Sequence, residues 1–172
     1  MKRLLLAALV PFLAACQEDA ARAPDPVSMT SEALSHFCLM QIDRHPGPKA
    51  QIHLEGFPDP IFFAQVRDAL AYVKGPERDG DILAFYVSDM GAAPGWADPG
   101  ADNWIVAETG HFVVGADVTG GMGAPEIVPF STRAGAQGFA AQKGGAVMSL
   151  GDIPAETVLA PVEVTTRKEP PA

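Results

Sequence analysis

Basic residues are scarce in this 172-residue sequence, in which 12 lysines and arginines stand against 21 aspartates and glutamates. The resulting formal net charge of −9 argues against a nucleic-acid partner and against a basic patch that binds anionic lipid. A resident membrane span is also missing, because the apolar run from Leu4 to Leu13 is far shorter than the roughly 20 residues that a span needs. These absences favour one folded domain that attracts cationic cargo or partners.

Patterns of common enzyme chemistry are missing as well. No glycine pattern follows a strand and opens a helix, as a nucleotide-binding loop requires. Cys38 and His111 could in principle form a thiol–imidazole pair, but no nucleophile signature surrounds them. The acids Asp68, Asp89 and Glu108 have no partner at catalytic spacing. We therefore predict that the chain is not an enzyme and has no catalytic residues.

The first 16 residues have the three parts of an export signal. Two basic residues lead into the apolar run, which ends in the small-residue sequence Leu13-Ala14-Ala15-Cys16. A cysteine directly after Leu-Ala-Ala resembles the lipobox of bacterial lipoproteins, whose cysteine receives several acyl chains and thereby anchors stably. We predict a signal peptide at 1–15 and lipid attachment at Cys16, facing the periplasm. Gln17 in place of an aspartate favours the outer membrane.

The remainder divides into a tether, a folded domain and a tail. Residues 16–30 are predicted to form a lipid-anchored flexible tether, because the polar, proline-bearing stretch 17–30 has no apolar periodicity. Residues 163–172 end in Arg-Lys-Glu-Pro-Pro-Ala and are predicted to be a frayed tail. Residues 31–162 between them are expected to form one domain.

Strand-like and helix-like patterns alternate within this domain. The expected strands are 36–42, 49–54, 81–87, 103–106, 111–114, 127–130 and 147–150, and the expected helices are 60–74 and 132–143, with a short helical turn near Pro154. The order strand, strand, helix occurs twice, over 36–74 and over 111–143. The pattern therefore predicts an α+β domain with a tandem repeat.

The segment His36-Phe37-Cys38-Leu39-Met40 carries the most specific chemistry. If it is a strand, His36, Cys38 and Met40 lie on one face, and the flexible thioether of Met40 can reach an ion bound to Cys38. A thiolate with a thioether is a soft donor set that selects Cu(I) over hard cations. A tetrahedral zinc site needs more thiolates or imidazoles than this stretch supplies. We predict that Cys38 and Met40 bind Cu(I).

Cys38 has no disulfide partner if Cys16 carries lipid. A lone thiol in an oxidising compartment is either buried and inert or kept for metal or redox chemistry. Core filling by Cys38 and Met40 is therefore the alternative interpretation. Export, the missing partner and the polar His36 on the same face favour the metal.

Further candidate ligands lie far along the chain. Met122 has glycines on both sides, which exclude regular structure and leave little local core for the side chain to fill. Met90 lies at the end of an expected strand, and His111 begins another. His45 is interpreted as a turn residue and His53 as part of a solvated strand face.

Several of these segments, in this order and spacing, resemble the NosL family, the copper-binding lipoproteins that accompany nitrous oxide reductase. Family members often have glycine between the cysteine and the methionine, where this chain has Leu39. The matching segments are the lipobox 13–16, then 36–40, 47–52, 62–63, 66–69, 87–91, 104–105, 121–126 and 129–131.

The resemblance implies a fold, a cargo and partners. It implies two ββα units similar to the organomercurial lyase fold, and a metallochaperone that delivers Cu(I) to the copper–sulfide centre of nitrous oxide reductase. The implied ligands are Cys38 and Met40, with Met122, then His111, then Met90 as further candidates. The implied partners are nitrous oxide reductase and its membrane-associated assembly transporter.

Two other functions stay open at this point. Fold analogy with the lyase allows a thiol-dependent enzyme that uses Cys38. The second open function is that of a structural outer-membrane lipoprotein in which Cys38 is part of the core.

Overall fold

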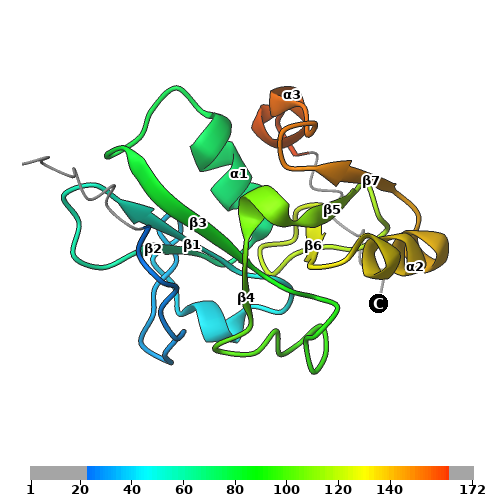
Figure 1. Ribbon diagram of the computed structural model, residues 1–172, viewed down its shortest axis with the longest axis horizontal. Helices are drawn as coiled ribbons and strands as arrows, with labels where there is room; N and C mark the ends of the chain where they lie inside the picture. Colours follow the sequence, from blue (N-terminus) through cyan, green and yellow to red (C-terminus); the bar gives the residue numbers. More distant parts are fainter. Residues whose placement is uncertain (1–22, 163–172) are drawn as a thin grey trace, which may run out of the picture.

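The computed structural model describes residues 23–162, which form two small antiparallel sheets. The first sheet has the strand order β2-β1-β3-β4 and the second the order β6-β5-β7. Figure 1 shows α1 beside the first sheet and α2 at the far end of the second. The strands are β1 (Ala50–Leu54), β2 (Ile61–Phe63), β3 (Ile82–Ser88), β4 (Trp104–Val106), β5 (His111–Val114), β6 (Val128–Phe130) and β7 (Ala146–Ser149). The helices are α1 (Val66–Lys74), α2 (Arg133–Lys143) and α3 (Ala155–Leu159), with 3-10 helices η1 (Ile42–Arg44) and η2 (Ala107–Thr109).

The two sheets have the same connectivity of strands and helix. In the first, β2 and β3 pair antiparallel with β1 on its two sides, and α1 joins β2 to β3. In the second, β6 and β7 flank β5 in the same way, and α2 joins β6 to β7. The predicted α+β domain of two tandem ββα units is confirmed, and the repeat extends to the strand after each helix.

The first unit begins later in the chain than predicted. Residues 36–42, expected as a strand, form a turn that leads into η1, and the expected helix 60–74 is β2 followed by α1. Ile61 and Phe62 fit the helical spacing of the apolar side chains over 60–74. In the structure, however, Ile61 to Phe63 pair with Ala50 to Ile52 of β1. Tertiary pairing on a buried surface therefore overrides the local pattern.

The second helix begins and ends as predicted because its caps are encoded locally. The Thr132 hydroxyl accepts a hydrogen bond from the Gly135 N–H at 3.1 Å, so it caps the first turn of α2. Gly144 follows the last turn with φ +75°, a conformation that costs glycine little. These two residues set the helix bounds within one residue of the expected 132–143.

The central strand β1 is buried on both faces, at all five positions. Ala50, Ile52 and Leu54 belong to the main hydrophobic core, which also includes side chains of α1. Because side chains alternate along a strand, Gln51 and His53 lie on the opposite face. His53 is only 8% exposed, so its assignment to a solvated face was wrong.

The N-terminal segment is hydrogen bonded to this opposite face. The backbone of Val27 exchanges two hydrogen bonds of 2.9 Å with the Gln51 carboxamide. The Tyr86 hydroxyl donates to Pro24 O at 2.6 Å, and Met29 N–H donates to Ala101 O. The folded body thus includes residues 24–29, and the prediction of a flexible tether is wrong for this part.

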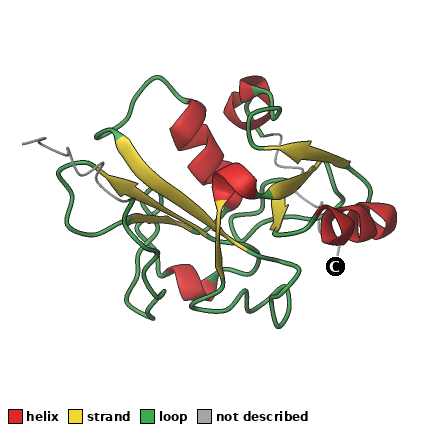
Figure 2. Ribbon diagram, in the orientation of Figure 1, coloured by secondary structure: helices red, strands yellow, loops and turns green. Residues whose placement is uncertain are grey.

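Three other predictions fall on residues outside the described part of the chain. The signal peptide 1–15, lipid attachment at Cys16 and the tail 163–172 all lie there. Within residues 23–162, no helix is both long enough and apolar enough to cross a membrane. Figure 2 shows how short the helices are beside the strands and loops.

Replacing Gln51 by methionine is expected to release the N-terminal segment. The thioether has no group that can replace both hydrogen bonds to Val27, and each such bond contributes about 1 kcal/mol. Together the two bonds contribute about 2 kcal/mol, so hydrogen-exchange mass spectrometry should show a roughly 30-fold loss of protection at residues 24–29. Gln142→Met, on the exposed face of α2, is the matched control, and equal protection in both variants would contradict the assignment.

Candidate metal centre

Cys38 and Met40 lie on a tight turn and not on a strand. Ser35 N–H donates to Met40 O at 2.9 Å, and Leu39 N–H donates to Ser35 O at 2.8 Å. Leu39 has φ +56°, the left-handed conformation that glycine adopts most easily. The alternation argument for Cys38 and Met40 was therefore wrong, because a closed turn brings the two residues onto one short loop instead.

Both sulfur-bearing side chains of this turn are accessible. Cys38 is a free, half-buried cysteine, and the Met40 side chain is 45% exposed. Core filling was the alternative interpretation of this pair. Neither residue belongs to the hydrophobic core, so that interpretation is wrong for them.

The turn is fixed on the connection between β2 and α1. His36 N–H donates to Phe62 O at 2.7 Å, and the buried Ser35 hydroxyl accepts from Ala64 N–H at 3.2 Å. Buried backbone groups need such partners, since an unpaired one costs about 1–3 kcal/mol. The polar contacts of Ser35 and His36 thus hold an irregular loop in one place.

His36 is directed away from a shared metal face. Its ring packs against Phe63 and Tyr72, and Nε2 lies 3.4 Å from the Asp79 carboxylate. The expectation that His36 shares a strand face with Cys38 and Met40 was wrong. His36 instead supports the turn through Asp79.

Met122 lies on a glycine loop that is held against the same connection. Gly120 N–H donates to Ala124 O, and Thr119 pairs with Pro125 in an isolated bridge, so the loop is closed. Met122 N–H donates to the side-chain oxygen of Gln65 at 2.9 Å, and its own side chain is 42% exposed. The prediction of an irregular, exposed Met122 is confirmed.

Consecutive residues therefore anchor the two loops that carry the predicted donors. Ala64 binds Ser35 of the Cys38–Met40 turn, and Gln65 binds Met122. The structure brings these segments together although they lie some eighty residues apart in the sequence.

His45 joins the same two segments and was missed as a donor. Its Nδ1 lies 3.1 Å from Gly121 O, and since a carbonyl oxygen only accepts, Nδ1 carries the proton. Nε2 then has a free lone pair, and within the described chain this buried atom has no hydrogen-bond partner. An imidazole oriented through its other nitrogen is the usual arrangement of a metal ligand. The sequence signal for His45 was that this histidine follows Met40 closely in the chain.

Met90 and His111 both lie at the second sheet, since Met90 N–H donates to Pro129 O of β6 and His111 begins β5. Met90 packs against the second, smaller core cluster and lines a cavity of about 430 Å³ with Trp96 and Phe139. His111 is the first residue of β5, half-buried and paired with Phe130 and Ser149. No hydrogen bond or ring contact that the described residues make joins either one to the Cys38–Met40 turn.

The described residues offer no site for a harder metal ion such as zinc. Among residues 23–162, no group of three or more His, Cys, Asp or Glu side chains could hold a metal ion. Structural zinc sites need four such ligands and catalytic ones three. The candidate donors are the thiol and thioether of the turn, the thioether of Met122 and the imidazole of His45, which suit a soft ion.

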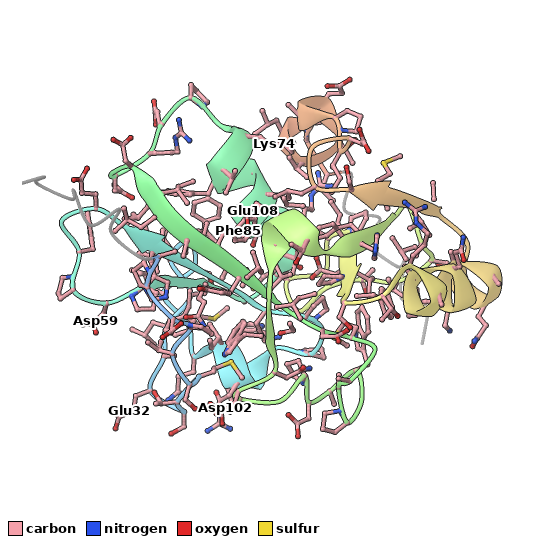
Figure 3. All side chains as sticks on the ribbon, viewed as in Figure 1. Glu32, Asp59, Lys74, Phe85, Asp102 and Glu108 are labelled. Atoms are coloured by element: carbon pink, nitrogen blue, oxygen red, sulfur yellow. The ribbon has the colours of Figure 1, made fainter. Side chains whose placement is uncertain are left out.

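Two exposed acidic side chains lie at one edge of the molecule. Glu32 and Asp102 occupy the same edge of the molecule (Figure 3), and the hydrogen bond from Met29 to Ala101 joins their segments. Both side chains are exposed, in a chain of formal net charge −9. Their field attracts cations toward this edge.

Several known proteins have sequences similar to this one. A family model described as NosL matches residues 26–158. The chain is 52% identical to the copper-binding lipoprotein NosL of Achromobacter cycloclastes, over 100% of this chain and 89% of the relative. It is 31% identical to the copper-binding lipoprotein NosL of Stutzerimonas stutzeri, over 87% of this chain and 78% of the relative.

Solved structures share the fold. The crystal structure of the copper chaperone NosL from Shewanella denitrificans is similar with a TM-score of 0.70 and 32% identity, covering 75% of this chain and 95% of that one. The solution NMR structure of the apo-NosL protein from Achromobacter cycloclastes is similar with a TM-score of 0.50 and 54% identity, covering 68% and 94%.

Leu39→Gly is expected to stabilise the protein. A left-handed non-glycine residue costs roughly 1–2 kcal/mol, and the greater freedom of glycine in the unfolded chain offsets about half of that. Leu39 is 72% exposed, so little packing is lost. Urea denaturation should show a free energy of unfolding higher by about 0.5–1 kcal/mol.

The control for this substitution is Leu83→Gly. Leu83 is also exposed, at 45%, but it lies in the extended strand β3. That variant is expected to lose about 0.5–1 kcal/mol. Equal destabilisation by both substitutions would show that Leu39 is not strained.

Proposed function

Because the chain belongs to the NosL family, we propose that it is a copper-binding lipoprotein that carries Cu(I) as cargo. It delivers the ion for assembly of the copper–sulfide centre of nitrous oxide reductase. The observation that carries the proposal is the exposed turn with a free thiol, Cys38, and a thioether, Met40, two residues apart. The copper-binding names of the relatives support the same cargo.

The donor set favours the monovalent ion. Thiolate and thioether sulfur are soft ligands that prefer Cu(I), whereas carboxylates suit harder cations. Met122 and His45 complete the candidate set, because Gln65 holds the backbone of one and Gly121 O orients the ring of the other. His45 takes the place of His111 as the imidazole donor.

Delivery requires that the ion be held without being enclosed. Met40 and Met122 are each more than two-fifths exposed, so an acceptor can place its own ligand on the ion before these thioethers leave. Stepwise exchange avoids a free ion at any stage. The proposed acceptors are nitrous oxide reductase and its membrane-associated assembly transporter.

The rival function as a thiol enzyme has little support. Cys38 is the only cysteine among the described residues, and no hydrogen bond there joins it to a histidine. The relatives carry the names of copper-binding proteins and not of enzymes. We infer that the chain is not an enzyme and that Cys38 binds cargo.

The anchor is proposed at Cys16, with the domain facing the periplasm from the outer membrane. The relatives are named lipoproteins, and the lipobox of this chain ends at Cys16. Cys16→Ser is expected to abolish acylation, so that radiolabelled palmitate supplied to the cells no longer appears in the protein. A variant that still carries palmitate would contradict the anchor, and wild type in the inner membrane would contradict the address.

Loading the reduced, detergent-solubilised chain anaerobically with Cu(I) is expected to give about one tightly held ion per chain. Cys38→Ser should abolish this binding, and Met40→Leu should weaken it by about 10-fold or more, since even outer-shell changes cost about 10- to 100-fold. Competition with a chromogenic Cu(I) chelator measures both. Loaded wild type should then transfer copper to copper-free nitrous oxide reductase.

Met148→Leu is the matched control, because this thioether lies on β7 and packs against the core. It should bind and transfer copper like wild type. Unchanged affinity in Met40→Leu would refute the ligand assignment. Tight binding without transfer to the reductase would refute the delivery step.

A further inference from the structure

Gln65 lies between the candidate copper loop and a cluster of buried acids. Its side chain is 1% exposed, and its carboxamide oxygen accepts the Met122 N–H at 2.9 Å. Its Nε2 donates to the Asp68 carboxylate at 3.2 Å. Because a carboxylate accepts and an N–H donates, these two bonds determine which end of the carboxamide faces Met122.

Glu126 is the second buried group beside this loop. It is 1% exposed, and its Oε1 accepts N–H bonds from Arg67 at 3.1 Å and from Ile127 at 2.9 Å. Its Oε2 is buried and finds no partner in the part of the chain that the structure describes. A buried carboxyl oxygen without a donor is costly, and it becomes less so when it carries a proton.

The charged neighbours of Glu126 leave it without a direct counter-ion. Lys49 is fully buried, but its ammonium group donates to Gly47 O and forms no ion pair with Glu126 in the described chain. Burial raises the pKa of Glu126 to about 8, against the attraction of Lys49, and burial lowers the pKa of Lys49 to about 8. Asp68 also raises the pKa of Glu126, and Arg67 meets Glu126 only through its backbone N–H, because its guanidinium donates to Thr157 O and Ala160 O. The neutral acid therefore predominates at neutral pH.

Gly120 shows how close Glu126 and Gln65 lie. A Cβ at residue 120 would collide with Oε2 of Glu126 and with the side-chain oxygen of Gln65 at once. Each of the two oxygens thus lies within 2.5 Å of the same point. The Gln65 oxygen has a second lone pair beyond the bond to Met122, which is available to accept a hydrogen bond from the protonated Glu126 carboxyl.

We propose that Gln65 is a positioning residue of the copper site, held between Asp68 and a protonated Glu126, and that it sets copper affinity by holding Met122 in place. The proposal rests on the proposed function, since it concerns the same site. Ionisation of Glu126 removes its donor and places negative charge against the Gln65 oxygen. The anchor of Met122 then weakens as the pH rises.

The first test compares two buried glutamines in the full chain. Gln65→Met removes the acceptor for Met122 and is expected to weaken Cu(I) binding about 5- to 10-fold, the worth of one such hydrogen bond. Gln51→Met is the matched control, because Gln51 is equally buried and also binds backbone, but at the N-terminal segment. It should leave copper affinity unchanged. Circular dichroism confirms that both variants are folded.

The second test compares Glu126→Gln with wild type between pH 6.5 and 9.5. Glutamine keeps a donor on the same atom at every pH, so the ratio of the two affinities should grow with pH to about 5-fold in favour of the variant at pH 9.5. The ratio removes any effect of pH that the two proteins share. A role of Glu126 in folding alone would not move this ratio in the folded protein.

The outcomes separate the inference from the function it rests on. Failure of wild type to bind Cu(I) refutes the proposed function. Tight binding by wild type, with equal affinities for Gln65→Met and Gln51→Met or a ratio that is flat with pH, refutes the positioning role alone. Loss of affinity confined to Gln65→Met, together with the rising ratio, supports it.

Discussion

Two neighbouring hydrogen bonds at the start of α1 determine where the candidate donors lie. The Ala64 N–H reaches the Ser35 hydroxyl, and the Gln65 side chain accepts the Met122 N–H. Neither loop contains regular structure, so each satisfies only some of its backbone groups internally. Burial makes an unpaired group costly, and this cost selects the observed loop positions over alternatives that expose the same residues.

The scaffold and the site have opposite requirements. β1 is buried on both faces and is covered by α1 on one side and by residues 24–29 on the other. The thioethers of Met40 and Met122 remain exposed on loops attached to this scaffold. A protein that transfers a bound ion needs ligands that an acceptor can reach, on a scaffold that stays rigid when those ligands release the ion.

The buried polar cluster is the cost of this arrangement. Lys49, Gln65 and Glu126 are all nearly inaccessible to solvent, although such side chains rarely are. Most of their polar atoms are used to hold backbone: Gly47 O, Met122 N–H, Arg67 N–H and Ile127 N–H. A purely apolar core under these loops could not bind their backbone groups, so the cluster provides order where secondary structure does not.

The sequence by itself determined the elements that local chemistry encodes, and it indicated the candidate donors Cys38, Met40 and Met122. The Thr132 cap and Gly144 bound α2, the apolar pattern marked most strands, and the glycines around Met122 indicated an exposed loop. Cys38 and Met40 stood out because a thiol with no expected disulfide partner lies two residues from a thioether. Only the tertiary structure decided that these donors lie on a turn, that Ile61–Phe63 is a strand, and that His45 faces the Met122 loop. Those features depend on hydrogen bonds between residues far apart in the chain, and no local pattern reports such a partner.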